Sequence, residues 1–278
     1  MRHIYLNLKR FDIPTSLGGV NRLAPMEQWG AKIVKETQAA LRAYKPEDVE
    51  FCMYLPEAHL LGALAARDEG SPVQIGSQSV YREDTAVGGN FGAFTTNRPA
   101  NAVKAMGCTS TIIGHCEERK DKAGILAEAG IVDTDAVNRL LNKEIKAAQA
   151  AGLTVLYCIG ESSEEQPRWQ EVLSRQLEIG LDGVDKSRVV IGYEPIWSIG
   201  PGKTPADKPY ITKIARFVQE VIGGIDVVYG GGLKSDNAEM LSSIQEISGG
   251  LIALTRFQGE IGFYPEEYLE IIRLYLGQ

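Results

Sequence analysis

The sequence predicts an α/β protein, a closed (β/α)8 barrel in which each of eight parallel strands is followed by a helix. Short apolar or β-branched runs recur eight times, and helical patterns fill most of the gaps between them. Continuous apolar runs of this length suit strands buried on both faces, and their alternation with helices requires crossover connections. The eight expected strands are residues 3–8, 49–55, 72–78, 110–115, 154–160, 188–194, 225–231 and 250–255.

Three segments carry clear helical patterns, residues 26–44, 134–152 and 207–224. Asp133, Thr134 or Asp135 can cap the second of these helices, and Gly152 is expected to end it. Eight strands favour a closed barrel over an open doubly wound sheet, which five or six strands would indicate. No G-x-G-x-x-G pattern follows the first strand, which also weighs against a dinucleotide-binding fold. No linker, charge run or low-complexity segment divides the chain, so we expect one domain over residues 1–278.

The bulk properties of the chain narrow the classes of partner. Its 278 residues carry a net charge of −7, which argues against nucleic-acid binding because that requires a basic face. An anionic substrate remains compatible, since a pocket can be locally positive on an acidic protein. We recognise neither a signal peptide nor a membrane span. The four cysteines form no C-x-x-C pair and the three histidines show no zinc-ligand spacing, so we expect a reduced cytoplasmic protein without a metal.

Polar residues at the carboxyl ends of the strands are the candidates for an active site, because barrels of this kind place it there. A lysine, a histidine and a glutamate would meet at this mouth, which is a proton-transfer constellation beside a cation. Lys9 lies two residues from Asn7 and so shares its face of an extended strand. The strand-end residues are Asn7, Lys9, Gln78, His115, Glu117, Glu161, Glu194, the glycines 230 to 232, Thr255 and Arg256.

Several segments resemble the motifs of triosephosphate isomerases, in that family's order along the chain. YEPIWSIGPGKT resembles the mobile lid, IIGHCEER the histidine segment, NLK the asparagine–lysine pair and VYGGGLKSDNA the phosphate loop. CIGE and GAFT also fit, and the match runs essentially from end to end. The resemblance implies a single-domain (β/α)8 TIM barrel and an aldose–ketose isomerase that acts on a short phosphorylated sugar through an enediolate.

The resemblance also implies roles for individual residues. Glu194 would remove a proton from the carbon next to a carbonyl, and loss of solvation against apolar lid residues such as Trp197 would make it a stronger base. His115 would polarise the substrate carbonyl as a neutral imidazole, because a helix that begins after Gly114 disfavours the imidazolium. No cofactor is expected, since the substrate carbonyl itself acidifies the C–H bond.

The remaining candidates would hold the substrate and the lid. Lys9 would stabilise the enediolate and attract the anionic substrate, and Asn7 would position both. Glu117 would lie behind Lys9, near the subunit contact. Residues 195–197 and 203–205 would be the hinges of the lid, with Gly200 and Gly202 between them. The other lid and phosphate residues implied are Trp197 and Lys203 in the hinges, the Gly200 backbone N–H, Gly231 and Gly232 at the phosphate, and the Tyr229 hydroxyl as a latch.

The chain departs from the family pattern around the phosphate. Leu254 and Thr255 stand where the family has paired glycines, and Gly232 replaces a serine. Arg256 has two alternative roles: its guanidinium grips the anion in a bidentate manner, or it points outward. Cys116 replaces a serine beside the histidine, and we expect a small, weakly polar side chain to suffice there.

The expected dimer contact is altered as well. Asn97 and Glu118 stand where the family has a glutamate and an arginine that pair across the dimer. Thr95 is retained, so we expect a homodimer through loop 92–97 with different polar contacts. The family default for the reaction is interconversion of glyceraldehyde 3-phosphate and dihydroxyacetone phosphate. The alternatives are a paralogue that isomerises a tetrulose phosphate and a non-catalytic barrel that binds a sugar phosphate.

Overall fold

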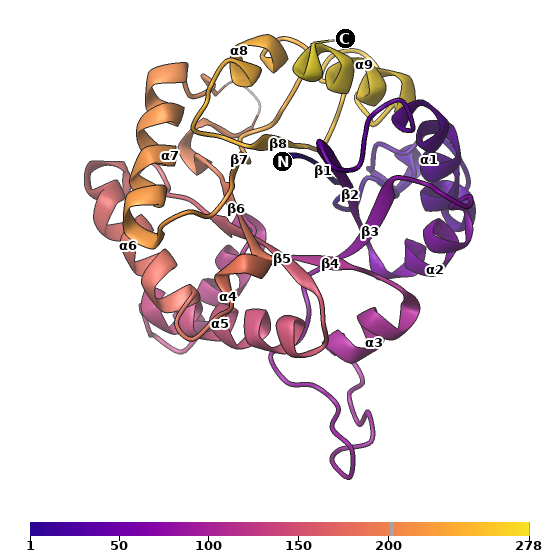
Figure 1. Cartoon of the computed structure of the whole chain (residues 1–278). Helices are drawn as coiled ribbons and strands as arrows, with labels where there is room; N and C mark the ends of the chain where they lie inside the picture. The colour runs from indigo at the N-terminus through magenta and orange to yellow at the C-terminus, as the bar shows by residue number, and fades with distance from the viewer. Residues whose placement is uncertain (201–202, 278) are drawn as a thin grey trace.

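A computed structural model describes residues 1–200 and 203–277 and contains the expected closed barrel. The strands pair in chain order, β8 pairs with β1, and the ring is seen end on in Figure 1. All of these pairs are parallel. The strands are β1 (Arg2–Asn7), β2 (Val49–Leu55), β3 (Val73–Gln78), β4 (Ser110–Ile113), β5 (Thr154–Ile159), β6 (Val189–Tyr193), β7 (Val227–Tyr229) and β8 (Gly249–Ile252).

Helices surround the barrel and connect its strands (Figure 1). The expected helices are present as α1, α5 and α7, and the Asp133 carboxylate caps α5 by accepting the Ala136 N–H at 2.8 Å. No helix in the described ranges has the length and apolar character that crossing a membrane requires. The helices are α1 (Met26–Leu41), α2 (Glu57–Ala65), α3 (Ala100–Met106), α4 (Cys116–Glu128), α5 (Thr134–Ala150), α6 (Trp169–Gly180), α7 (Lys208–Ile222), α8 (Ala238–Ser242) and α9 (Pro265–Leu276), with short 3-10 turns at Thr15–Leu17, Gln166–Arg168, Lys186–Arg188 and Ile196–Ser198.

The strands divide their side chains between two apolar layers. In β5, Leu156 and Cys158 pack inside the barrel, whereas Val155 and Ile159 belong to the larger core between strands and helices. This alternation follows from the two-residue period of a strand. The inner cluster consists of Tyr5, Cys52, Tyr54, Ile112, Leu156, Cys158, Val228 and Leu251. Because side chains fill the barrel, a substrate can meet reactive groups only at its ends.

The amino ends of the strands carry a separate polar cluster. His3 lies 2.7 Å from Glu50 and 2.9 Å from Asp226, and the Tyr5 hydroxyl donates to Glu50 at 2.7 Å. Burial lowers the pKa of His3, but the two carboxylates outweigh burial and raise it. Polar contacts at this end of such a barrel indicate stability rather than catalysis.

Candidate active site

Glu194 follows β6 directly, and two groups from the end of β4 hold its carboxylate. The Cys116 backbone N–H donates to Glu194 Oε2 at 2.9 Å, and His115 Nε2 lies 3.0 Å from Oε1. Only 3% of the Glu194 side chain and 12% of the His115 side chain are exposed. The two residues predicted as base and electrophile therefore meet in a site that is largely withdrawn from water.

His115 is the N-cap of α4, and its Nδ1 accepts the Glu117 N–H at 3.4 Å. Burial lowers the pKa of His115, but the Glu194 charge and the contacts with Cys116 and Glu194 together raise it to about 10. The Glu194 carboxylate at Nε2 favours the imidazolium in this substrate-free site, whereas the Glu117 N–H at Nδ1 favours the expected neutral ring, because only an unprotonated nitrogen accepts a hydrogen bond. The helix terminus adds about 1 kcal/mol in favour of the neutral ring, so the charge state of His115 depends on where Glu194 lies.

Lys9 is held at the mouth by its neighbours on β1 and β3. It follows β1 with a left-handed φ of 40°, which is uncommon for a residue with a side chain. Asn7 Oδ1 accepts the Lys9 N–H at 3.1 Å and the Gln78 amide at 3.2 Å, and Gln78 also donates to the Lys9 carbonyl at 3.1 Å. Gln78 is among the strand-end residues but received no role from sequence, and here it fixes the turn that carries Lys9.

One cleft connects the predicted residues of β1 and β4. It has a volume of about 160 Å³, and Asn7, Lys9, His115 and Glu117 are among its lining residues. Lys9 Nζ lies 3.4 Å from Glu117 Oε1, so Glu117 lies near Lys9, where we expected it, with 69% of its side chain exposed. Through the contact between His115 and Glu194, all four candidate catalytic residues lie at this mouth.

The segment predicted as the first hinge of the lid is anchored on Glu161. A single oxygen, Oε1, accepts the Trp197 indole N–H at 2.8 Å and the Tyr193 and Tyr210 hydroxyls at 2.9 and 3.0 Å. Glu161 is fully buried, and its Oε2 has no partner among the described residues. Burial raises the pKa of Glu161, and the three donors oppose that rise. Glu161 had no role predicted from the sequence, although its place at the end of a strand was the available signal.

Tyr229, the last residue of β7, contacts both ends of the lid. Burial raises the pKa of Tyr229 to about 12, and hydrogen bonds with the Ser198 side chain and the Ala206 backbone oppose this. These partners lie on either side of the lid tip, so the position of the hydroxyl suits the predicted latch. Within the lid, the exposed Lys203 donates its N–H to the Gly200 carbonyl at 3.3 Å. Residues 201 and 202, and with them the expectation for Gly202, lie outside the described residues.

The predicted phosphate loop that follows Tyr229 requires its glycines. A Cβ added at Gly231 would lie 2.2 Å from the Tyr229 hydroxyl, and Gly232 has a φ of 101°. The loop also carries a cation that sequence analysis did not single out. A Cβ at Gly232 would lie 3.2 Å from Lys234 Cε, and Lys234 Nζ lies 4.2 Å from the centroid of the Phe257 ring. The aliphatic stem of Lys234 therefore packs against Gly232, where the family serine would be.

Arg256 is engaged by α9 rather than left available for an anion. Its Nε donates to Glu267 Oε1 at 2.7 Å, Nη2 reaches the same oxygen, and the guanidinium lies 3.8 Å from the Tyr264 ring centroid. The backbone N–H groups of Thr255 and Arg256 both reach the Gly262 carbonyl. In this substrate-free structure the contact with Glu267 favours the outward alternative for Arg256, and its predicted place among the phosphate-binding residues stays a prediction.

Comparison with known proteins agrees with this geometry. The family model described as triosephosphate isomerase matches residues 26–273. The chain is 33% identical over 211 residues to the triosephosphate isomerase of Parasynechococcus marenigrum, which covers 74% of this chain and 79% of the relative. It is 30% identical over 256 residues to that of Syntrophotalea carbinolica, covering 87% and 91%. The crystal structure of triosephosphate isomerase from Bartonella henselae shares the fold, with a TM-score of 0.73 and 24% identity over 99% of both chains. The family model and these two relatives show that the chain belongs to the triosephosphate isomerase family and is an isomerase.

Proposed function

We propose that this isomerase interconverts glyceraldehyde 3-phosphate and dihydroxyacetone phosphate through an enediolate. The observation that carries the proposal is the convergence of Glu194, His115 and Lys9 at one end of the barrel. A carboxylate, an imidazole and an ammonium supply the base, the polarising group and the charge that isomerisation through an enediolate requires. The relatives cited above carry the name of this activity.

The first step is proton removal from the substrate carbon by Glu194. The carboxylate leaves the Cys116 N–H and the His115 ring, which hold it in the substrate-free site. Its burial means that few water molecules solvate it as it approaches the carbon, which favours proton transfer. The same carboxyl group then returns the proton to the neighbouring carbon, so one residue serves both halves of the reaction.

His115 acts on the substrate oxygens in the same steps. The charge of Glu194 raises the pKa of His115, and this interaction weakens when the carboxylate leaves the ring for the substrate carbon. The ring then releases its extra proton to solvent before the C–H bond breaks, and the Glu117 N–H at Nδ1 favours the neutral ring with its remaining proton on Nε2. That N–H donates to the carbonyl oxygen, and the ring carries the proton between the two oxygens of the enediolate.

Charge stabilisation and closure complete the proposed mechanism. Lys9 offsets the negative charge of the enediolate, with Asn7 and Gln78 fixing the turn that carries it. The lid closes so that Gly200 meets the phosphate beside Gly231 and Gly232. Closure excludes water and so limits loss of phosphate from the intermediate. The Trp197–Glu161 bond and the Tyr229 contacts guide the two ends of this movement.

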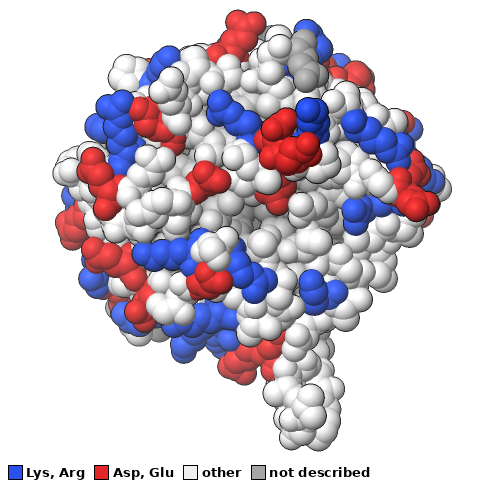
Figure 2. Space-filling view, in the orientation of Figure 1, with Lys and Arg blue, Asp and Glu red and all other residues white. Residues whose placement is uncertain are grey.

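We also propose a homodimer that forms through the loop between β3 and α3. Figure 1 shows this loop extending away from the ring, and Figure 2 shows that its tip carries no charged side chains. Val87 is fully exposed and Phe91 is 89% exposed, and such apolar side chains at the tip of a projecting loop favour a partner surface. Thr95 lies exposed in the same loop, as a plug into a partner requires.

The free cysteines fit a reducing, cytoplasmic location.

The test is an isomerase assay in both directions, with Glu194→Gln as the diagnostic variant. Loss of a general base lowers kcat by about 10²- to 10⁴-fold, and we expect at least this loss. Glu164→Gln, at an exposed position outside the site, is the matched control and should retain full activity. Turnover that survives Glu194→Gln would refute the role of the base, and binding of substrate without turnover by the wild type would support the non-catalytic alternative.

The altered end of β8 favours a second candidate substrate, a tetrulose phosphate. The Thr255 and Arg256 N–H groups bond to the Gly262 carbonyl, so the strand-eight loop is built differently from a pair of glycines. A longer sugar phosphate would contact this loop, so the loop would determine the length of the substrate. A higher kcat/KM for the tetrulose phosphate than for either triose phosphate would favour this second candidate over the first.

A further inference from the structure

We propose that Cys116, His115 and Glu194 form a binding site for a soft divalent cation such as Zn²⁺, whose occupancy blocks the isomerase. One ligand atom from each residue lies within 4.8 Å of the other two. The sulfur, imidazole nitrogen and carboxylate oxygen are the donor types that zinc selects in proteins. The spacing along the chain does not reveal this set, because Glu194 joins the other two only through the fold.

The distances require only a small contraction around an ion. Cys116 Sγ lies 3.7 Å from His115 Nδ1, and His115 Nε2 lies 3.0 Å from Glu194 Oε1. Zinc bonds of about 2.0 to 2.3 Å place tetrahedral donors roughly 3.5 Å apart. An ion binds only one of the two ring nitrogens. Since one ligand atom from each residue lies within 4.8 Å of the other two, no separation has to shrink by more than about 1.3 Å, which rotation of the cysteine and glutamate side chains can supply. Three protein ligands leave a fourth position for water.

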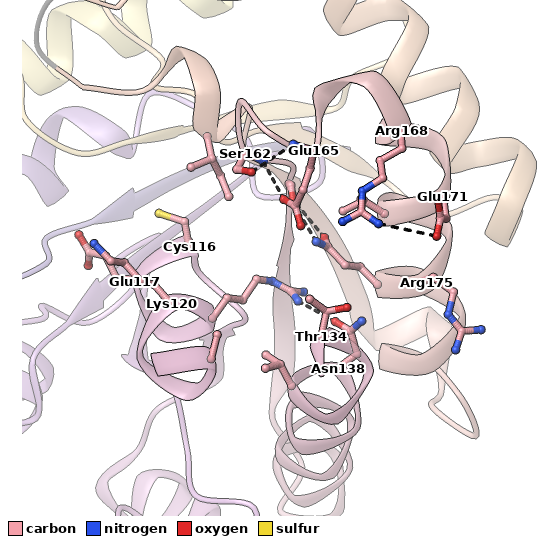
Figure 3. A pocket seen from close by; sticks show the side chains of 17 residues that line it. Cys116, Glu117, Lys120, Thr134, Asn138, Ser162, Glu165, Arg168, Glu171 and Arg175 are labelled. Carbon is pink, nitrogen blue, oxygen red and sulfur yellow. Dashed lines mark hydrogen bonds and ion pairs between the residues drawn. The ribbon is translucent and has the colours of Figure 1, made fainter. Parts of the chain in front are cut away.

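The charges and the accessibility of the site suit a divalent ion. On coordination the thiol loses its proton to solvent, and the imidazole releases there the extra proton that its contact with Glu194 favours, so a thiolate and a carboxylate balance the two positive charges around a neutral imidazole. Cys116 is partly exposed, whereas Cys52, Cys108 and Cys158 are buried and do not compete. Cys116 also lines a cavity of about 380 Å³ between α4, α5 and α6 (Figure 3).

Inhibition follows from the identity of the ligands and rests on the proposed function. A bound ion occupies the lone pair with which Glu194 removes the proton, and it holds the His115 ring away from the carbonyl to which its Nε2–H donates. It also holds Glu194 near Cys116, so the carboxylate cannot move to the substrate. Hard ions such as Mg²⁺, which prefer oxygen ligands, should bind and inhibit weakly.

The test is metal titration of the full chain and of Cys116→Ser, which removes the sulfur and keeps the backbone N–H. Co²⁺ is the spectroscopic probe, Zn²⁺ is followed by calorimetry, and inhibition is expressed relative to each protein's own metal-free rate. In the wild type we expect one ion per chain, a cobalt–thiolate absorption band and inhibition that a chelator reverses. In Cys116→Ser we expect no thiolate band and at least a tenfold weaker zinc affinity, about the lower limit for disturbing a ligand set.

A second variant guards against a general effect of the cysteine change. Glu194→Gln keeps the thiol but weakens the third ligand, so zinc affinity should fall while the thiolate band remains. Equal zinc affinity in the wild type and in Cys116→Ser, or no thiolate band in the wild type, would overturn the site. Zinc binding through Cys116 in a chain without isomerase activity would leave the site standing and refute the proposed function instead.

Discussion

Substitution of Glu144 by glutamine is expected to change how stability depends on pH. Lys122 Nζ lies 2.9 Å from Glu118 Oε1 and 2.9 Å from Glu144 Oε1, so one ammonium serves two buried carboxylates. Glu144 Oε2 has no partner among the described residues. Burial and the charge of Glu118 raise the pKa of Glu144 to about 8, with Lys122 opposing the rise. The pKa of Glu118 is lowered despite burial, chiefly by Lys122.

The size and sign of the effect follow from this shift. The pKa of Glu144 rises from 4.5 to about 8, and each unit corresponds to about 1.4 kcal/mol, so the ceiling is roughly 5 kcal/mol. Because the folded-state pKa is the higher one, the contribution to stability is complete below pH 4.5 and is lost as pH rises through 8. Glu118 shares Lys122 and shifts in the opposite direction, so we expect a difference smaller than this ceiling.

The assay is urea unfolding of wild type and Glu144→Gln at about pH 5 and about pH 9, at one protein concentration. The free energy of unfolding of the wild type minus that of the variant should fall by roughly 2 to 4 kcal/mol between the two pH values. Glu239→Gln, at an exposed position on α8, is the control and should show no such change. A difference between wild type and Glu144→Gln that is the same at both pH values would refute the buried-proton argument.

Three further substitutions test the lid, the phosphate loop and the subunit contact. Trp197→Phe removes a hydrogen-bond donor to the buried Glu161 carboxylate, a contact worth about 1.5 to 3 kcal/mol. Steady-state kcat should therefore fall about tenfold or more. An unchanged kcat would exclude Glu161 as the anchor of the lid hinge. Lys234→Ala removes a cation beside the predicted phosphate loop, so KM should rise roughly fivefold, about 1 kcal/mol, while kcat stays nearly constant. If KM does not change at low salt, Lys234 does not contribute to phosphate binding. Phe91→Asp should weaken the homodimer in sedimentation experiments, whereas a monomeric wild type would contradict the proposed contact.

The strands could be predicted from sequence because a strand buried on both faces consists of a continuous apolar run. Their ends were less certain. The expected strand 225–231 is observed as Val227–Tyr229, and 110–115 as Ser110–Ile113. Gly114 follows Ser110–Ile113 and turns the chain with a φ of 80°, whereas the Gly230 N–H still bonds to the Tyr193 carbonyl of the neighbouring strand. The sequence locates the apolar run, but the backbone conformation after it decides where the strand ends.

The candidate site divides in a similar way between what sequence reveals and what only the fold reveals. Strand position and the family motifs located Glu194, His115 and Lys9, because each is tied to the end of one strand. The supporting groups Gln78 and Glu161 act on residues of other strands, so their roles depend on contacts between distant segments. Arg256 illustrates the same limit, since a sequence cannot state whether an anion or the carboxylate of another helix satisfies a guanidinium.

The end of β5 contacts both Glu194 and the hinge of the lid that covers it. A Cβ added at Gly160 would lie 1.9 Å from the Glu194 carbonyl oxygen, and one at Gly230 would lie 2.9 Å from Glu194 Cγ. Glycines on the two neighbouring strands therefore let the backbone close tightly around Glu194. Glu161, the next residue after Gly160, accepts the Trp197 N–H of the lid hinge. Because consecutive residues bear on the base and on the hinge, a displacement of this strand end disturbs both, and lid closure and placement of the carboxylate depend on one local piece of backbone.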